Sequence, residues 1–137
     1  MTDPISISSG ILALTSFAFQ SSGSLCQAVT SLQSNQRTVR ELKEELDDLN
    51  EVLHELQKMV ISGGVDLSLL QLPLLRCGNA CKDFKAIIDK CATHSESKTS
   101  IRDWAKLKYR GDDMGGFKNL LAGYKSTIMI ALANANM

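Results

Sequence analysis

The stretch VRELKEELDDLNEVLHELQKMV, from Val39 to Val60, decides the fold class. Its apolar residues recur in alternating steps of three and four, which places them along one side of an α-helix. The other sides carry mostly acidic and basic residues, which suit contact with water. Ser62, Gly63 and Gly64 follow, and glycine readily takes the left-handed conformation that ends helices. We therefore predict one long amphipathic helix, whose core seam comprises Leu42, Leu46, Leu49, Leu53 and Leu56.

An uncharged stretch precedes this helix. Residues 4–36 contain no acidic or basic side chain, and their apolar residues are mostly three or four positions apart from Ile7 to Leu32. This spacing predicts a first helix that begins after Pro4 and buries one apolar stripe. Gly23 and the neighbouring serines have low helix propensity, so we expect a bend or a break near residues 20–24.

The apolar cluster from Ile5 to Phe19 admits two interpretations. It is either a central helix covered by the other helices or an element that inserts into a membrane after a conformational change. Its 15 residues form a helix of about 22 Å, shorter than the roughly 30 Å hydrocarbon core, so it is not a resident transmembrane span. The candidate membrane element consists of Ile5, Ile7, Ile11, Leu12, Leu14, Phe17 and Phe19.

The rest of the chain also has helical periodicity. A short apolar connection is expected at residues 66–72. Pro73 then suits the first turn of a third helix. The core seam of this helix is Cys77, Cys81, Phe84 and Ile88, extended to Cys91. We expect a loop at 94–99, a helix capped by Ser100 and Asp103, and an interruption at Gly111. Asp112 or Asp113 can then cap a last helix through Met114, Phe117, Leu121, Tyr124, Ile128 and Ala131.

Together these segments predict an all-α fold, a bundle of four to five mostly antiparallel helices in a single domain of residues 1–137. The low aromatic content, 5%, and only two prolines agree with helices packed by Leu, Ile and Ala. The seam of residues 39–60 could also form a coiled-coil dimer. We favour the bundle core, because the other amphipathic helices offer the same seam partners inside one chain.

Composition and residue pattern favour no chemistry. Fifteen basic and fifteen acidic residues cancel, so no overall charge favours nucleic acid. His54 and His94 lack the cysteine or carboxylate spacing of a metal site or of a catalytic base, and no phosphate-binding glycine motif occurs. We expect no enzyme activity, no cofactor, no metal and no small-molecule substrate. The N-terminus has no secretory signal, which indicates a cytoplasmic setting with four free thiols.

One further surface is a candidate for binding. The C-terminal third is basic, and its cations are interleaved with aromatic residues, a combination typical of contact with anionic lipid or with a protein. An ordinary solvent-exposed face has the same composition. The candidate partner or lipid contact consists of Arg102, Trp104, Lys106, Lys108, Tyr109 and Arg110.

Four segments carry a resemblance to a known family: MTDPISISSGILALTSFAF at the start, ELKEELDDLNEVLHEL, CGNACKDFKAIIDKC, and SIRDWAKLKYRGDDMGGFKNLLAGYKSTIMIALANAN. Together they resemble the fungal N-terminal domains of STAND-type, NLR-like proteins, the family named after azaphilone pigment cluster protein L and related to HeLo-like domains. The block from Asp103 to Ile128 is the most specific part. The resemblance implies a helical bundle at the front of a larger receptor, with no catalytic residues to carry over.

The resemblance further implies a role in programmed cell death or non-self recognition, in which the bundle self-associates and then reaches a membrane. We therefore expect a signalling or effector module that is cytoplasmic and becomes membrane-associated on activation. The alternative is a protein adaptor without membrane activity, linked to secondary metabolism. Its docking surface would be the acidic helix of residues 39–60 or the region of Trp104.

Overall fold

The computed structural model describes residues 4–31, 37–94 and 98–135, and it describes the side chains of residues 10–31, 37–89 and 115–135. This part of the chain contains four α-helices, one 3₁₀ turn and no strand, which confirms the all-α bundle. In chain order the elements are α1 (Pro4–Ser31), α2 (Arg37–Ser62), the turn η1 (Ser68–Leu70), α3 (Gln71–His94) and α4 (Lys98–Ala135).

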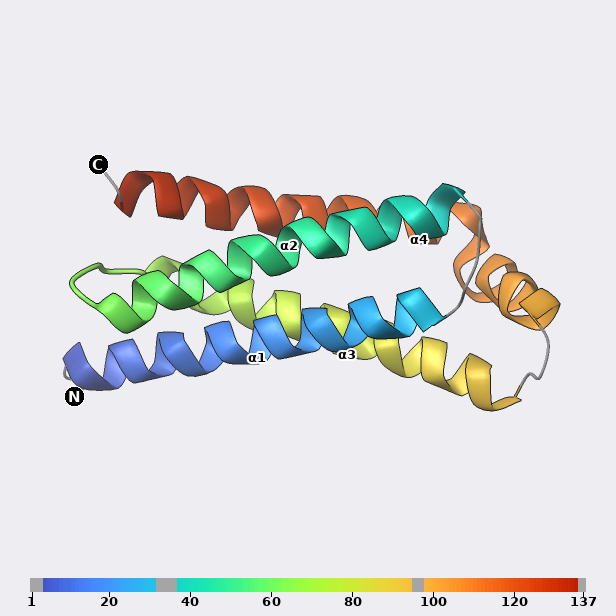
Figure 1. Cartoon of the computed structure of the whole chain (residues 1–137), viewed down its shortest axis with the longest axis horizontal. Coiled ribbons are helices and arrows are strands. Elements are labelled where there is room, and N and C mark those ends of the chain that lie inside the picture. The colour runs from blue at the N-terminus through green and yellow to red at the C-terminus, as the bar shows by residue number, and fades with distance from the viewer. Residues whose placement is uncertain (1–3, 32–36, 95–97, 136–137) are drawn as a thin grey trace.

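Successive helices run in opposite directions, as expected, but sequence neighbours are not always packing partners (Figure 1). The most extensive packing joins α1 to α3, then α1 to α2 and α2 to α4, whereas α3 and α4 touch more lightly. Around the bundle the order is therefore α3, α1, α2, α4. Two of the closest pairs, α1 with α3 and α2 with α4, run parallel (Figure 1).

One continuous core joins all four helices. The leucine seam of α2 supplies its centre, because every leucine from Leu42 to Leu56 in that seam is completely buried. Phe84 of α3 stacks on Phe117 of α4 with ring centroids 4.2 Å apart. Each fully buried leucine contributes about 1.5–3 kcal/mol relative to an exposed one. The seam of α2 is thus used inside the chain, and the structure favours the bundle over the coiled-coil dimer.

Helix α2 ends and α3 begins as the residue types predict. Gly63 and Gly64 have φ of 77° and 82°, and the amide of Gly63 donates to the carbonyl oxygens of Met59 and Val60 at 3.2 Å. These values are the left-handed conformation that closes a helix. Pro73 lies in the first turn of α3, where its missing N–H breaks no hydrogen bond.

The expected break in the first helix is wrong. Helix α1 continues through residues 20–24, where Ser22 and Leu25 are fully buried in the bundle. A glycine inside a helix costs only about 1 kcal/mol relative to alanine. Burial of the apolar stripe outweighs this cost, because most of the stability of a helix in a protein comes from its packed face.

The C-terminal expectations need a similar correction. Helix α4 is continuous across Gly111 and the aspartates at 112 and 113, so they neither interrupt a helix nor cap one. The helix begins at Lys98, which places Ser100 and Asp103 inside it and excludes the expected cap. Helix α3 includes His94, and only residues 95–97 of the expected loop remain between helices, outside the described residues. A single glycine again costs less than propagation of the helix on both sides contributes.

Candidate functional site

Helix α1 carries the candidate membrane element, and the structure turns the described part of that element inward. Ile11 is 3% exposed, Leu14 and Phe19 pack against the core, and Leu12 and Phe17 are half-buried. The side chains of Ile5 and Ile7 lie outside the described residues. The outward face of α1 is uncharged and mostly polar, with exposed positions at Ala13, Gln20, Gln27, Thr30 and Ser31.

The interface of α1 with α3 is close and apolar. Gly78 of α3 is buried beneath the ring of Phe17, and a Cβ atom on residue 78 would collide with that ring. Absence of a side chain therefore sets how near the two helix backbones lie. Cys77 and Cys81, on the same helix, are fully buried in the core beside this contact.

The interface of α1 with α2 is more polar. The amide Nε2 of Gln57 donates to Ser16 Oγ at 3.2 Å, and Cys26 Sγ donates to Asp47 Oδ1 at 3.2 Å. Ser22 Oγ and Asn50 Oδ1 are buried without a hydrogen-bond partner among the described residues. A buried polar group without a partner costs about 1–3 kcal/mol. Helix α1 is therefore held less firmly by α2 than by α3.

An open groove of about 820 Å³ runs along α1 beside α2. No charged side chain lines it, and Gly23 leaves open space where another residue would place a Cβ atom. A groove of this kind can receive uncharged or apolar groups without burying an unpaired charge. Its lining residues are Phe19, Gln20, Gly23, Ser24, Cys26, Gln27, Thr30, Ser31 and Asn50.

The described cysteines are free thiols in protected settings. Burial, and next the hydrogen bond to the Asp47 carboxylate, raises the pKa of Cys26 to about 11. The hydrogen bond with Cys77, together with burial, raises the pKa of Cys81 further. Thiolate is the reactive form of cysteine, so these thiols are poor nucleophiles at neutral pH. The side chain of Cys91 lies outside the described residues.

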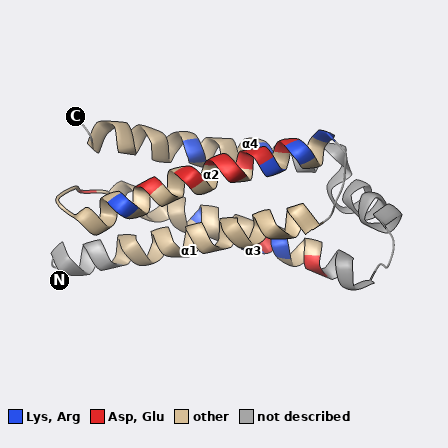
Figure 2. Cartoon of the chain, in the orientation of Figure 1, with Lys and Arg blue, Asp and Glu red and all other residues tan. Residues whose placement is uncertain are grey.

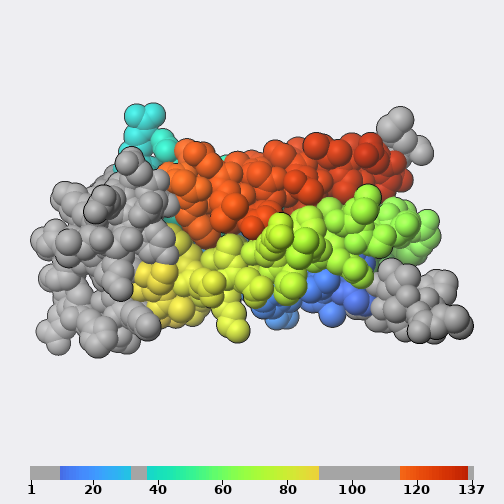
Figure 3. Space-filling view, turned by 180° about the vertical axis from the view of Figure 1, so that it is seen from behind, coloured from blue at the N-terminus to red at the C-terminus, as the bar shows by residue number. Residues whose placement is uncertain are grey.

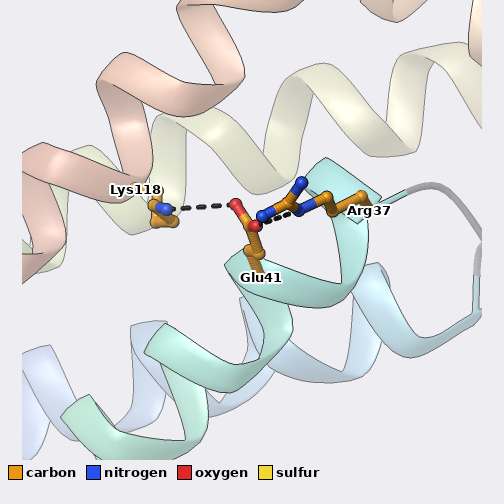
Figure 4. A network of polar contacts seen from close by, with 3 residues as sticks. All are labelled: Arg37, Glu41 and Lys118. Carbon is orange, nitrogen blue, oxygen red and sulfur yellow. Dashed lines mark hydrogen bonds and ion pairs between the residues drawn. The ribbon is translucent and has the colours of Figure 1, made fainter.

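Ion pairs that the sequence alone does not predict fasten α2 to α4. Glu41 lies between Lys118 of α4 and Arg37 of its own helix (Figure 4). Its Oε2 is 3.1 Å from Lys118 Nζ, and its Oε1 is 2.8 Å from Arg37 Nε. One helical turn further on, Lys125 Nζ lies 2.9 Å from Glu45 Oε1 and 3.6 Å from Asp48 Oδ2. The hydrogen bond from Lys118 is the main reason why the pKa of Glu41 is lowered. The hydrogen bond to Glu45 likewise raises the pKa of Lys125.

A signal for these pairs exists in the sequence. The acids at 41, 45 and 48 share one side of α2, and the lysines at 118 and 125 share one side of α4. Only the knowledge that α2 and α4 are parallel neighbours brings the two sets together. The sequence predicts a solvated face for these acids, and Glu41 and Glu45 are instead partly buried against α4.

The basic region of α4 holds the other predicted contact site. Arg102, Trp104, Lys106, Lys108, Tyr109 and Arg110 belong to α4, and their side chains lie outside the described residues. Within the described part of the chain, no helix combines the length and the hydropathy that crossing a bilayer requires.

Comparisons with known proteins fix the relationship of the chain. A family model described as pigment biosynthesis cluster protein PigL N-terminal matches residues 2–137. The match covers nearly the whole sequence and agrees with the resemblance carried by the four segments. No curated protein and no solved structure matches the chain.

Proposed function

Because the chain belongs to the PigL N-terminal family, we propose that it is a helical signalling module of a fungal receptor-like protein. In this proposal it acts by contact and catalyses no reaction. Copies brought together by clustering self-associate, and α1 then moves from the bundle to a membrane surface.

The absence of charge on α1 is the observation that carries this proposal. The helix Pro4–Ser31 has no acidic or basic residue, although 22% of the whole chain is charged. Figure 2 shows the contrast between the described part of α1 and the charged turns of α2. A charged side chain costs about 2.5–3.5 kcal/mol at the centre of a bilayer. Helix α1 can approach lipid without that cost.

The packing of α1 supports its release from α2. The seam between them has two hydrogen bonds at 3.2 Å, and Ser22 Oγ of α1 and Asn50 Oδ1 of α2 are buried without a hydrogen-bond partner in the part of the chain that the structure describes. Release exposes the stripe of Ile11, Ala18 and Leu25, which is apolar enough to enter the lipid interface. Interfacial helices usually carry Lys or Arg, and α1 has neither, so one copy binds lipid weakly. Several clustered copies bind through avidity.

Vesicle leakage tests the proposal. The chain is fused to an oligomeric scaffold and added to dye-loaded vesicles of anionic or of neutral lipid. We expect leakage from the clustered form and none from the unclustered chain. If the clustered chain neither binds nor permeabilises either vesicle, the membrane step is wrong.

A crosslink between α1 and α2 makes the test specific. Cys26 lies 3.2 Å from the carboxylate of Asp47, so Asp47→Cys places a second thiol opposite it. A bis-methanethiosulfonate crosslinker, which forms a disulfide with each of the two thiols and releases sulfinate, should suppress leakage by the clustered chain, and reduction of the two disulfides should restore it. The uncrosslinked Asp47→Cys chain is the matched control. If the crosslinked and uncrosslinked chains cause equal leakage, release of α1 from α2 is not required and this part of the proposal is wrong.

The acidic face of α2 favours a second candidate, a protein adaptor. Glu44, Asp47, Glu51 and Glu55 are exposed along the outer side of α2. Such a face suits a basic protein surface, which attracts it over several ångströms. Paired reversal of Glu44 and Glu51 to Lys should abolish capture of such a partner and leave vesicle leakage unchanged. The corresponding test of the basic region is reversal of Arg102 and Lys106, with thermal stability unchanged within about 0.5 kcal/mol.

A further inference from the structure

The first turns of α3 and the turn before them are apolar on two opposite sides. Leu67, Leu70 and Leu74 point into the core, with exposed fractions of 6%, 3% and 0%. Leu69, Leu72 and Leu75 are 92%, 51% and 41% exposed. A helical segment that is apolar all round is normally covered on both sides. This one is covered on one side only.

The outward leucines lie on one strip. They are spaced three apart along the continuous helical path of η1 and α3, and such positions share a side of a helix. Figure 3 shows the first turns of α3 on the outer surface, between α4 and α1. Further along α3 the exposed side chains are Asn79, Lys82, Asp83, Ala86 and Asp89 among the described residues, and none of them is a large apolar residue. The apolar strip is therefore a local feature of residues 69–75.

Two opposite charges border the strip. Asp66 precedes it, and its carboxylate accepts the Ser68 amide at 3.1 Å. That hydrogen bond lowers the pKa of Asp66, so it is ionised at neutral pH. Arg76 lies at the other end, exposed and without an ion-pair partner among the described residues.

We infer that the strip of Leu69, Leu72 and Leu75 is the contact surface for a second copy of this chain, related to the first by a two-fold axis near Leu72. Such an interface uses the same patch on both copies. With the axis at Leu72, Leu75 of one copy faces Leu69 of the other. Arg76 then comes within a helical turn of Asp66 of the other copy, and this attractive pair occurs twice.

The chemistry of the strip favours a second copy over a membrane. The strip has no Trp or Tyr, and its bordering charges cancel, so it lacks the aromatic anchors and the positive charge of surfaces that bind anionic lipid. Its opposite charges match a two-fold copy of themselves. Three leucines bury far less than the roughly 800 Å² per partner of a standard interface. The pairing is therefore weak and needs a high local concentration, which clustering supplies.

This inference rests on the self-association in the proposed function and names its surface. Sedimentation of the full chain over a wide concentration range tests it through charge reversal. Asp66→Arg leaves two positive ends, and Arg76→Asp leaves two negative ends, so each variant repels itself. We expect each to dimerise roughly tenfold more weakly than the unmodified chain.

An equimolar mixture of the two variants gives the decisive readout. Asp66→Arg chains pair with Arg76→Asp chains, so the mixture regains the dimer that each variant alone forms only weakly. The chain with both substitutions also regains it. If the single variants sediment like the unmodified chain, or if the mixture gains nothing, the inference is overturned. Circular dichroism of each variant verifies that the helices remain.

A thiol on the proposed axis provides an independent measurement. Leu72→Cys should form an intermolecular disulfide at least tenfold faster than Asn79→Cys, an exposed control on the same helix, because only the former lies at the axis. Equal rates contradict the axis.

The same variants in the leakage assay separate the two proposals. If the clustered chain causes leakage but the charge-reversal variants dimerise like the unmodified chain, the strip is not the dimer contact and the membrane step stands. If the variants lose dimer and the mixture regains it but no leakage occurs, the membrane step is wrong and the dimer contact stands. Leu72→Ser distinguishes a second copy from lipid. If this substitution lowers vesicle binding and leaves sedimentation unchanged, the strip binds lipid and the proposed contact with a second copy is wrong.

Discussion

The ring of Phe17 in α1 occupies the space that a side chain at Gly78 in α3 would need. This contact lies in the most extensive interface of the bundle, between two helices that run parallel. It makes residue 78 a sensitive point, because neither backbone can move apart without losing the packing around it.

Gly78→Ala should lower the free energy of unfolding by about 1–3 kcal/mol, the usual effect of overpacking a core. Urea unfolding measures this change. Gly23→Ala is the matched control, because nothing lies within 4 Å of its added Cβ atom, and it should stabilise the helix by roughly 0.5–1 kcal/mol. Phe17→Leu should partly rescue Gly78→Ala, and purely additive effects would contradict the contact.

Ser22→Ala should leave stability unchanged or raise it by about 1 kcal/mol, because the hydroxyl it removes is buried without a partner among the described residues. Ser16→Ala makes the same chemical change on the same helix but leaves Gln57 Nε2 without its acceptor, and should cost about 0.5–1.5 kcal/mol. Thermal unfolding compares the two. Equal destabilisation would mean that Ser22 has an essential polar contact.

The ion pairs between α2 and α4 should shape the pH dependence of stability at both ends. The pKa of Glu41 is lowered in the folded chain, so its ion pairs stabilise the fold fully above its unfolded pKa of about 4.3. This stabilisation is lost as the pH falls through the pKa of Glu41 in the folded chain. The pKa of Lys125 is raised, so its contribution is complete below about pH 10.4 and is lost as pH rises through the folded value.

Substitution of each lysine separates the two limbs. Lys118→Met should flatten the acid limb of a plot of urea midpoint against pH, and Lys125→Met the alkaline limb. Lys82→Met, at an exposed position of α3, should change neither limb. The ion pairs would be irrelevant to stability if all three variants gave parallel curves.

Cys26 should react slowly with alkylating reagents. Its pKa of about 11, against about 8.5 for a free thiol, leaves roughly a hundredfold less thiolate at pH 8. Asp47→Ala removes a hydrogen bond and a negative charge that both raise this pKa, so it should accelerate the reaction. Mass spectrometry of the peptide that contains Cys26 measures the rate, with urea-unfolded protein as the reference. A rate that Asp47→Ala leaves unchanged would contradict the contact.

The sequence carried enough information for the helices and for most of the core. The seam of α2 and that of α3 each have the period of a helix, and Gly63 and Gly64 end α2 at the expected place. Periodicity reports which side of a helix is buried, but not by which neighbour. The ion pairs of Glu41 and Glu45 with α4 therefore stayed hidden until the order of the helices around the bundle was known.

The predicted breaks within helices are wrong. Gly23 and Gly111 both lie inside continuous helices, because the local preference of one residue is small beside the packing or propagation of a long helix. The collision that restricts Gly78 had no sequence signal either, since it depends on where Phe17 of another helix lies. Leu69 and Leu72 fall in the segment predicted as an apolar connection, and Leu75 falls in the predicted third helix. Their exposure has no sequence signal, because a run of leucines does not show which of them face solvent.

The order of the helices around the bundle also bears on how the chain acquires its structure. Because α2 and α3 are consecutive but not adjacent, the connection at residues 63–70 crosses the bundle, and 39 positions separate the end of α1 from the start of α3, its main partner. Such distant pairing slows folding relative to a bundle of sequential hairpins. On a ribosome adding about 5–20 residues per second, the apolar stripe of α1 waits several seconds for α3. A nascent chain is thus exposed to premature association through the helix that the mature bundle keeps covered.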